Sequence, residues 1–220
     1  MIPLRSTERV YSTAVVTIAL IAVNLLVFLY ETSLNQWQLN VFIARHGIVP
    51  DRLHYSTLIE SMFLHGGWLH VLGNMWFLWI YGRNVEDILG SGKYFAFYML
   101  CGLAAALVHV FFNPYSRVPT VGASGAIAGV MGAYLVKFPR ARIITLVPVF
   151  VFLTTLEIPA VLLLVYWFVI QFFSGFMSIG YSQVSEGGVA WFAHVGGFVT
   201  GMLLIMAMKT RDRLWSSRDY

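Results

Sequence analysis

Long apolar runs without Lys, Arg, Asp or Glu alternate with short polar connections along the chain. The runs lie at 12–30, 61–82, 94–116, 118–136, 143–156, 158–178 and 187–208. A helix needs about 20 apolar residues to cross the hydrocarbon core of a bilayer, and six of the runs come close to that length or exceed it. The pattern therefore predicts helices that span a membrane. Glu31, and not a small-residue cleavage site, follows the first run, so we expect a retained span and not a signal peptide.

The run at 143–156 is the exception, because it is short for a span. It contains Pro148, and only Glu157 to Pro159 separates it from the next run. Its length suits an interfacial or a re-entrant segment better than a crossing helix. The sequence leaves open whether this segment lies flat or dips into the bilayer.

The distribution of basic residues gives the orientation. With six spans and a cytoplasmic amino terminus, the cytoplasmic side receives Arg5, Arg9, Arg83, Lys93, Lys137, Arg140, Arg142, Lys209, Arg211, Arg213 and Arg218. The outer side receives only Arg45, Arg52 and Arg117. Cytoplasmic loops are enriched in Lys and Arg, so we predict six spans with both termini in the cytoplasm. Such a chain is a single transmembrane domain over 1–220, with a core of about 11–208 and short cytoplasmic tails.

The composition agrees with a membrane protein. Hydrophobic residues make up 59% of the chain and charged residues only 11%, against about 25% charged in an ordinary soluble domain. A soluble globular protein and a disordered chain are therefore excluded. The net charge of +4 contains no basic stripe, so no nucleic-acid partner is expected. The single cysteine, Cys101, cannot form an internal disulfide. The fold class predicted is an all-α polytopic membrane protein, a bundle of six transmembrane helices.

A serine stands near the start of the fourth span. The stretch from Gly122 to Lys137 corresponds to roughly 23 Å of helix, less than the hydrocarbon thickness of about 30 Å. We therefore expect this helix to begin below the outer surface, with Ser124 in its first turn, where free N–H groups favour developing negative charge. Taken alone, a serine among small residues is more often a helix-packing feature.

A histidine stands at a comparable depth in the sixth span. Gly197 and Gly201 lie three and seven residues after His194, on the same helix face. Small residues also follow Ser124 at intervals of four, so the two faces can pack closely and bring serine and histidine together. Taken alone, a histidine in a membrane helix is as often a hydrogen-bonded contact between helices as a catalytic residue. The glycines expected to support close packing are Gly122, Gly125, Gly129, Gly197 and Gly201.

The second span carries two further polar side chains, His70 and Asn74. They are four residues apart, so they share one helix face and offer two donors to the same region. The remaining histidines are expected to be structural or loop residues: His46, His54, His65 and His109.

These residues fit nucleophilic catalysis. A nucleophilic serine needs a base to take its proton and donors to hold the oxyanion formed on attack at a carbonyl. Ser124 would be the nucleophile and His194 the base. The oxyanion donors would be the side chains of His70 and Asn74 and the backbone N–H groups of Ser124 and Ala123. Since no Asp or Glu lies near His194 in these spans, a Ser-His dyad is expected and not a triad.

The chain resembles the bacterial rhomboid intramembrane serine proteases. The motifs are His70-x-x-x-Asn74, Gly82-x-x-x-Glu86-x-x-x-Gly90, Gly122-Ala-Ser124-Gly125 and Ala193-His194-x-x-Gly197-x-x-x-Gly201. The resemblance implies a serine endopeptidase that forms an acyl-enzyme and cleaves single membrane helices near their outer end. It also implies an inner-membrane location, no cofactor or metal, and a fifth span with its following loop, about 159–188, that helps to admit substrate.

Two positions depart from the family pattern. Many relatives carry an aromatic residue four positions after the serine that packs on the histidine, but here that position is Ala128, so another group must orient His194. Some relatives have a Trp-Arg pair in the first loop, which is absent here.

Other classes fit less well. A zinc protease would need a His-Glu-x-x-His helix, which the sequence lacks. An aspartyl protease would need two aspartates in spans, but all four lie outside them: Asp51, Asp87, Asp212 and Asp219. A transporter or channel would need polar residues along a continuous route, whereas these gather at one end. A non-catalytic relative that only binds membrane helices would have no need of both Ser124 and His194.

Overall fold

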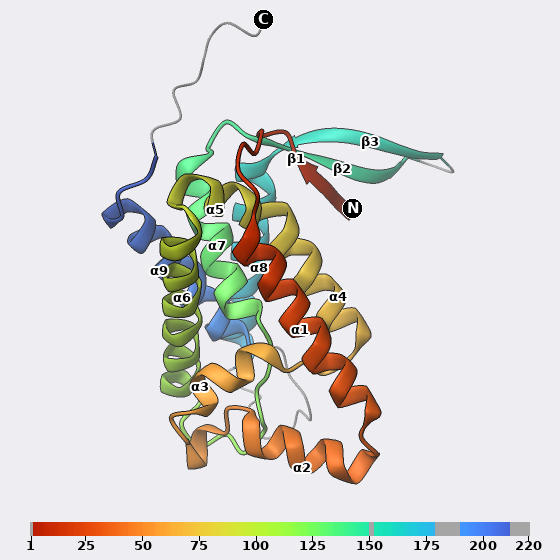
Figure 1. Cartoon of the computed structure of the whole chain (residues 1–220), viewed down its shortest axis with the longest axis vertical. Helices are drawn as coiled ribbons and strands as arrows, with labels where there is room; N and C mark the ends of the chain where they lie inside the picture. The colour runs from red at the N-terminus through yellow and green to blue at the C-terminus, as the bar shows by residue number, and fades with distance from the viewer. Residues whose placement is uncertain (1, 150–151, 179–189, 212–220) are drawn as a thin grey trace, which may run out of the picture.

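The computed structural model describes residues 2–149, 152–178 and 190–211. Most of them form helices that run alongside one another (Figure 1). The helices are α1 (Val15–Ser33), α2 (Gln36–His46), α3 (Thr57–Glu60), α4 (Trp68–Phe77), α5 (Arg83–Leu89), α6 (Ser91–Phe112), α7 (Ser124–Lys137), α8 (Ala160–Ser178) and α9 (Trp191–Ala207). Short 3-10 turns occur at Pro50–Arg52 and Ser61–Phe63. A π-helical segment, η3 (Leu78–Gly82), joins α4 to α5 without a break.

Each of the six predicted spans corresponds to a helix or, for the second, to the continuous rod formed by α4, η3 and α5. Among the described residues, two helices are long and apolar enough to cross a bilayer by length and composition, namely α1 and α6. Three shorter apolar segments, Ser124–Lys137, Ala160–Ser174 and Trp191–Ala207, fall below that length. The chain is thus a mostly helical protein with clear apolar spans.

The helix α7 lies within the bundle and packs against α6 and α9 (Figure 1). Every residue from Gly125 to Tyr134 is buried. A helix that is apolar on all sides and surrounded by other helices is typical of a bundle interior. The four glycines and alanines that precede Met131 keep its diameter small, so neighbouring helices can approach it closely. This position places the start of α7, and therefore Ser124, beside several other helices.

The all-α prediction is wrong for two segments, which form a three-stranded antiparallel sheet at the end of the bundle where α1 begins and α9 ends (Figure 1). The strands are β1 (Ile2–Ser6), β2 (Arg142–Val149) and β3 (Phe152–Pro159), in the order β1-β2-β3. The described parts of the run at 143–156, residues 143–149 and 152–156, therefore form strands. In β2 the residues Ile143, Thr145 and Val147 are buried while their neighbours are more exposed, which is the two-residue period of a strand. Pro148 and the β-branched residues also disfavour a helix there.

The Glu86 side chain of α5 joins the start of α1 to α5 and α6 through hydrogen bonds. The buried carboxylate of Glu86 accepts hydrogen bonds from the backbone N–H of Val16 at 2.9 Å and of Thr17 at 2.8 Å, and from the hydroxyls of Thr17 and Ser91 at 2.8 Å each. The first amides of a helix have no acceptor within the helix, so this carboxylate caps the start of α1. The chain turns from α5 into α6 at Gly90, whose φ of 76° suits glycine.

The segment before α7 is irregular but its backbone is paired. Ile48 and Thr120 exchange two hydrogen bonds, of 2.9 and 2.8 Å, and the N–H of Gly122 donates to the carbonyl of Ser61 at 2.9 Å. Irregular backbone at membrane depth requires such protein partners. The helix α7 then begins at Ser124 and has 14 residues, against 22 in α6. The short helix predicted from the spacing is confirmed.

Candidate active site

The amino-terminal ends of α4, α7 and α9 lie at the end of the bundle opposite the sheet, near α2 and α3 (Figure 1). Ser124 is the first residue of α7 and His194 is the fourth of α9, about one turn into the helix. The Nε2 atom of His194 lies 2.7 Å from the Oγ atom of Ser124, a hydrogen-bond distance. The structure therefore brings together the two residues on which the predicted chemistry depends.

Glycine contacts between α7 and α9 set this distance. A Cβ atom on Gly197 would overlap the carbonyl oxygen of Gly125, and one on Gly201 would overlap the carbonyl oxygen of Gly129. A Cβ on Gly129 would lie 2.5 Å from the Cβ of Cys101 on α6. The two helices thus approach until their backbones touch, as small residues permit. Close packing of small-residue faces agrees with the prediction, but the face of α7 that meets Gly197 and Gly201 carries Gly125 and Gly129, one residue after the predicted face of Ser124 and Ala128.

His70 lies next to Ser124, on the other side of Gly122. Gly122 has a φ of 132°, and a Cβ built there would lie 2.8 Å from Nε2 of His70 and 3.6 Å from Oγ of Ser124. The N–H of Gly66 donates to Nδ1 of His70 at 3.3 Å. Because Nδ1 accepts, a neutral His70 ring carries its proton on Nε2, the atom that faces Gly122. His70 can therefore donate a hydrogen bond beside the serine.

Asn74 follows His70 by one helical turn and is buried, with 9% of its surface exposed. Its Nδ2 atom has no hydrogen-bond partner among the described residues. A buried amide donor without a partner is costly, and such groups in proteins call for a specific explanation. Ala123, the predicted backbone donor, is the N-cap of α7 and is fully buried. The first amides of α7 have no acceptor within the helix.

Gln171, a residue of α8, contacts His194 and was not among the site residues predicted from the sequence. Its Oε1 atom lies 2.5 Å from Nδ1 of His194, and only 7% of its surface is exposed. The ring of Trp167, one turn earlier on α8, lies 5.7 Å from the His194 ring, with a 37° angle between the planes. A signal was available, because Gln171 is the only amide side chain in the run 158–178 and polar groups inside a bilayer are costly.

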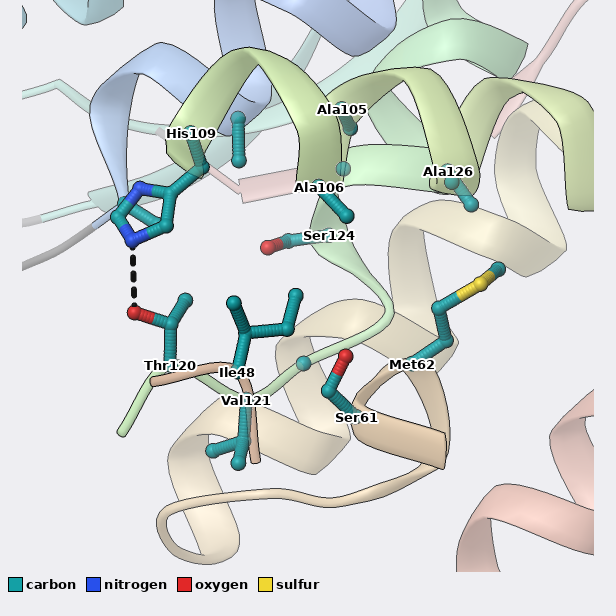
Figure 2. A pocket seen from close by; sticks show the side chains of 15 residues that line it. Ile48, Ser61, Met62, Ala105, Ala106, His109, Thr120, Val121, Ser124 and Ala126 are labelled. Carbon is teal, nitrogen blue, oxygen red and sulfur yellow. Dashed lines mark hydrogen bonds between the residues drawn. The ribbon is translucent and has the colours of Figure 1, made fainter. Parts of the chain in front are cut away.

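A small cavity of about 30 Å³ adjoins the serine, bounded by α6, α7, the 3-10 turn at Ser61–Phe63 and the segment before α7. Figure 2 shows the Ser124 side chain at its edge, with Ser61 opposite and His109 bonded to Thr120. The distance between Nε2 of His109 and Oγ1 of Thr120 is 2.9 Å, so His109 is the hydrogen-bonded packing residue that was expected. This volume suffices for one or two water molecules, which need polar partners such as these.

The ring of His65 lies 5.1 Å from that of His70, so this histidine is near the site. His65 is in the loop before α4, and His46 pairs with Glu60 at 2.9 Å. Part of the segment expected to admit substrate, residues 179–189, lies outside the described residues. Within the described ranges, no group of three or more His, Cys, Asp or Glu side chains is placed to hold a metal ion.

These features are those of a helical membrane protein with a serine and a histidine from neighbouring helices at one end of its bundle. The rhomboid domain model matches residues 52–211 of the chain. The chain belongs to the rhomboid family, whose members are membrane-embedded helical proteins.

Three similar proteins illustrate the range of the family. Rhomboid protease GluP of Bacillus subtilis is 34% identical over 114 residues, which are 50% of this chain and 22% of that protein. Rhomboid protein 1, mitochondrial, of Saccharomyces cerevisiae is 30% identical over 138 residues, 59% and 38% of the two chains. The rat presenilin-associated rhomboid-like protein, mitochondrial, is 28% identical over 207 residues, 91% of this chain and 50% of that one. The match thus covers at most half the length of these three relatives.

Proposed function

We propose that this chain is an intramembrane serine endopeptidase that cleaves membrane-helix substrates through a Ser124–His194 dyad. The observation that carries the proposal is the 2.7 Å contact between Oγ of Ser124 and Nε2 of His194, made by side chains from two different helices. One relative bears the name rhomboid protease, which supports the same activity. Nucleophile and base at this distance are the arrangement that activates a serine hydroxyl.

The reaction follows from these positions. His194 takes the Ser124 proton on Nε2 while Oγ forms a bond to the carbonyl carbon of the substrate peptide. The resulting oxyanion accepts hydrogen bonds from Nε2–H of His70, Nδ2–H of Asn74 and the backbone near Ala123. The C–N bond then breaks, and His194 gives its proton to the leaving amine. This step leaves an acyl-enzyme ester on Ser124.

Water completes the cycle. A water molecule attacks the ester carbon while His194 again takes a proton. The bond between Ser124 Oγ and the acyl carbon then breaks, His194 returns the proton to Oγ, and the acid product leaves. The cavity beside Ser124 is mostly apolar but includes Ser61, His109 and Thr120, and it is large enough to keep such a water next to the ester. Hydrolysis within an apolar bundle thereby requires no wide channel through the protein.

The substrates proposed are single-span membrane proteins, cut near the end of the span that lies level with the start of α7. We also propose six membrane spans with both termini in the cytoplasm, so that the site opens to the outer face. The surplus of Lys and Arg on the cytoplasmic side supports this orientation. The bacterial inner membrane stays a proposal, since the relatives include a Bacillus subtilis protein and proteins named as mitochondrial.

The test is labelling of the purified chain in detergent by a fluorophosphonate, which phosphonylates an activated serine with loss of fluoride. We expect the wild type to be labelled and both Ser124→Ala and His194→Ala to be unlabelled. Ser33→Ala, a serine substitution at the exposed end of α1, should label as the wild type does. A folded wild type that stays unlabelled, or a Ser124→Ala variant that labels normally, would contradict the proposal and favour a protein that only binds membrane helices.

A further inference from the structure

We infer that Gln171 is the positioning residue that holds His194 in the tautomer and orientation needed to activate Ser124. The inference rests on the proposed function, because it concerns the base of the same dyad. Its basis is the 2.5 Å distance between Oε1 of Gln171 and Nδ1 of His194. Both side chains are buried, with 7% and 9% of their surfaces exposed, so water does not compete strongly for this hydrogen bond.

The hydrogen bond decides which ring nitrogen carries the proton. A neutral imidazole has one N–H donor and one acceptor nitrogen. With the Gln171 oxygen facing Nδ1, the proton lies on Nδ1, and Nε2 is left as an acceptor 2.7 Å from the Ser124 hydroxyl. The opposite tautomer would direct an N–H at Ser124 and could not take its proton. Gln171 thus supplies the function that a carboxylate performs for histidine in a triad.

The helix α8 also supplies a ring beside the histidine. Residues four apart share a helix face, so Trp167 and Gln171 both point from α8 toward α9. The Trp167 ring lies 5.7 Å from the ring of His194. The residue four positions after Ser124, Ala128, is fully buried and offers no ring. Orientation of the base in this chain therefore comes from α8 and not from α7.

A purely structural role is the competing explanation. Polar side chains often join membrane helices, and a Gln–His hydrogen bond could serve only to hold α8 against α9. The two roles differ in what they change. Loss of a helix contact would lower stability and could alter probe binding, whereas loss of the tautomer would slow the chemical step alone. An acceptor of any kind at position 171 should restore the chemical step.

The test uses the full chain in detergent and the kinetics of fluorophosphonate labelling, separated into the binding constant KI and the maximal rate kinact. Gln171→Met keeps an unbranched side chain of similar length but removes the strong acceptor. We expect kinact to fall about 10-fold to 100-fold, by analogy with the loss of partners that orient metal-binding histidines, with KI unchanged. Gln171→Glu, whose carboxylate can only accept, should restore kinact. Ile170→Met, an exposed neighbour on α8, is the matched control and should label as the wild type does.

A second readout is independent of labelling. The ¹⁵N spectrum of the histidine rings, with the His194 signals assigned by their loss in His194→Ala, should show protonation at Nδ1 in the wild type. In Gln171→Met the two tautomers should mix. Equal kinact in wild type and Gln171→Met, no recovery in Gln171→Glu, or a wild-type ring protonated at Nε2 would each overturn the inference. An unlabelled wild type with Nδ1 protonated would instead count against the proposed function, and the tautomer assignment would stand.

Discussion

Two polar clusters lie at opposite ends of the rod formed by α4, η3 and α5, and they differ in how their hydrogen bonds are satisfied. At one end the buried carboxylate of Glu86 accepts four hydrogen bonds from α1 and from the start of α6. At the other end the buried Nδ2 of Asn74 has no partner among the described residues. An unpartnered buried group costs about 1–3 kcal/mol. The first cluster therefore holds helices together, and the second keeps a donor available for a group brought by another molecule.

The largest effect is expected from removal of the unpartnered donor, the Nδ2 group of Asn74. Asn74→Ala should slow fluorophosphonate labelling about 10²-fold to 10³-fold, the usual loss of one oxyanion donor. The free energy of unfolding should not fall, because no hydrogen bond within the described chain is lost. Labelling kinetics and unfolding in a denaturing detergent measure the two quantities.

The matched control for this substitution is Asn84→Ala, an asparagine on the same rod near Glu86. Its Nδ2 donates to the carbonyl of Glu8 at 3.3 Å, so this donor is already in use, while its Oδ1 has no partner among the described residues. Its labelling rate should equal that of the wild type. Comparable slowing in both variants would mean that Asn74 acts through the packing of the rod and not through a donor at the site.

Removal of the Glu86 carboxylate, the acceptor with four partners, should lower stability without slowing labelling. Glu86→Ala leaves the capping amides and two hydroxyls of its cluster without their acceptor, so we expect the free energy of unfolding to fall by about 3 kcal/mol. The labelling rate of the molecules that remain folded should not change, since Ser124 and His194 lie at the other end. Glu60→Ala, which breaks a partly exposed pair with His46, should cost less than about 1 kcal/mol. A slower rate per folded molecule in Glu86→Ala would contradict the separation of the two ends.

A smaller effect on labelling is expected from substitution of a glycine that packs α9 against α7. In Gly201→Ala the new methyl group overlaps the carbonyl oxygen of Gly129, so α9 must shift away from α7. Such overpacking costs about 1–3 kcal/mol, and it should slow labelling because His194 moves away from Ser124. Gly73→Ala, at a helical glycine with open space around its Cβ position, should leave labelling unchanged. Equal effects of the two substitutions would show that the glycine contact does not set the dyad distance.

Much of the bundle could be predicted because its determinants are local. Apolar runs mark helices, and small residues at intervals of four indicate close packing, although the face of α7 that touches α9 begins at Gly125 and not at Ser124 as predicted. Ser124 could be placed at the start of its helix from the length of the run alone. Those two regularities lead to the Ser124–His194 contact without knowledge of the remaining contacts.

The sheet escaped prediction because its alternation is hidden in an apolar run. Thr145 is buried beside apolar neighbours, so hydropathy alone does not separate the two faces of β2. The pairing of β2 with β1 joins residues more than 130 positions apart, which no local pattern reports.

The contact of Gln171 with His194 was not predicted for a related reason. The family resemblance directed attention to position 128 on the fourth span, whereas the partner of His194 in this chain comes from a different helix. Whether Gln171 meets His194 depends on how α8 is rotated about its axis against α9, and that rotation follows from packing along both helices. Its polarity in an apolar run was the available clue.

The π-helical segment η3 has a geometric consequence for the rod that bears both clusters. A π turn accommodates one more residue than an α turn, and each residue of an α-helix advances the direction of its side chain by about 100°. The wider turn at Leu78–Gly82 therefore changes the angular phase between His70 and Glu86 compared with an unbroken α-helix of the same sequence. Deletion of a single residue between Leu78 and Tyr81 would leave the residues of both motifs unchanged but turn one motif toward a different neighbouring helix.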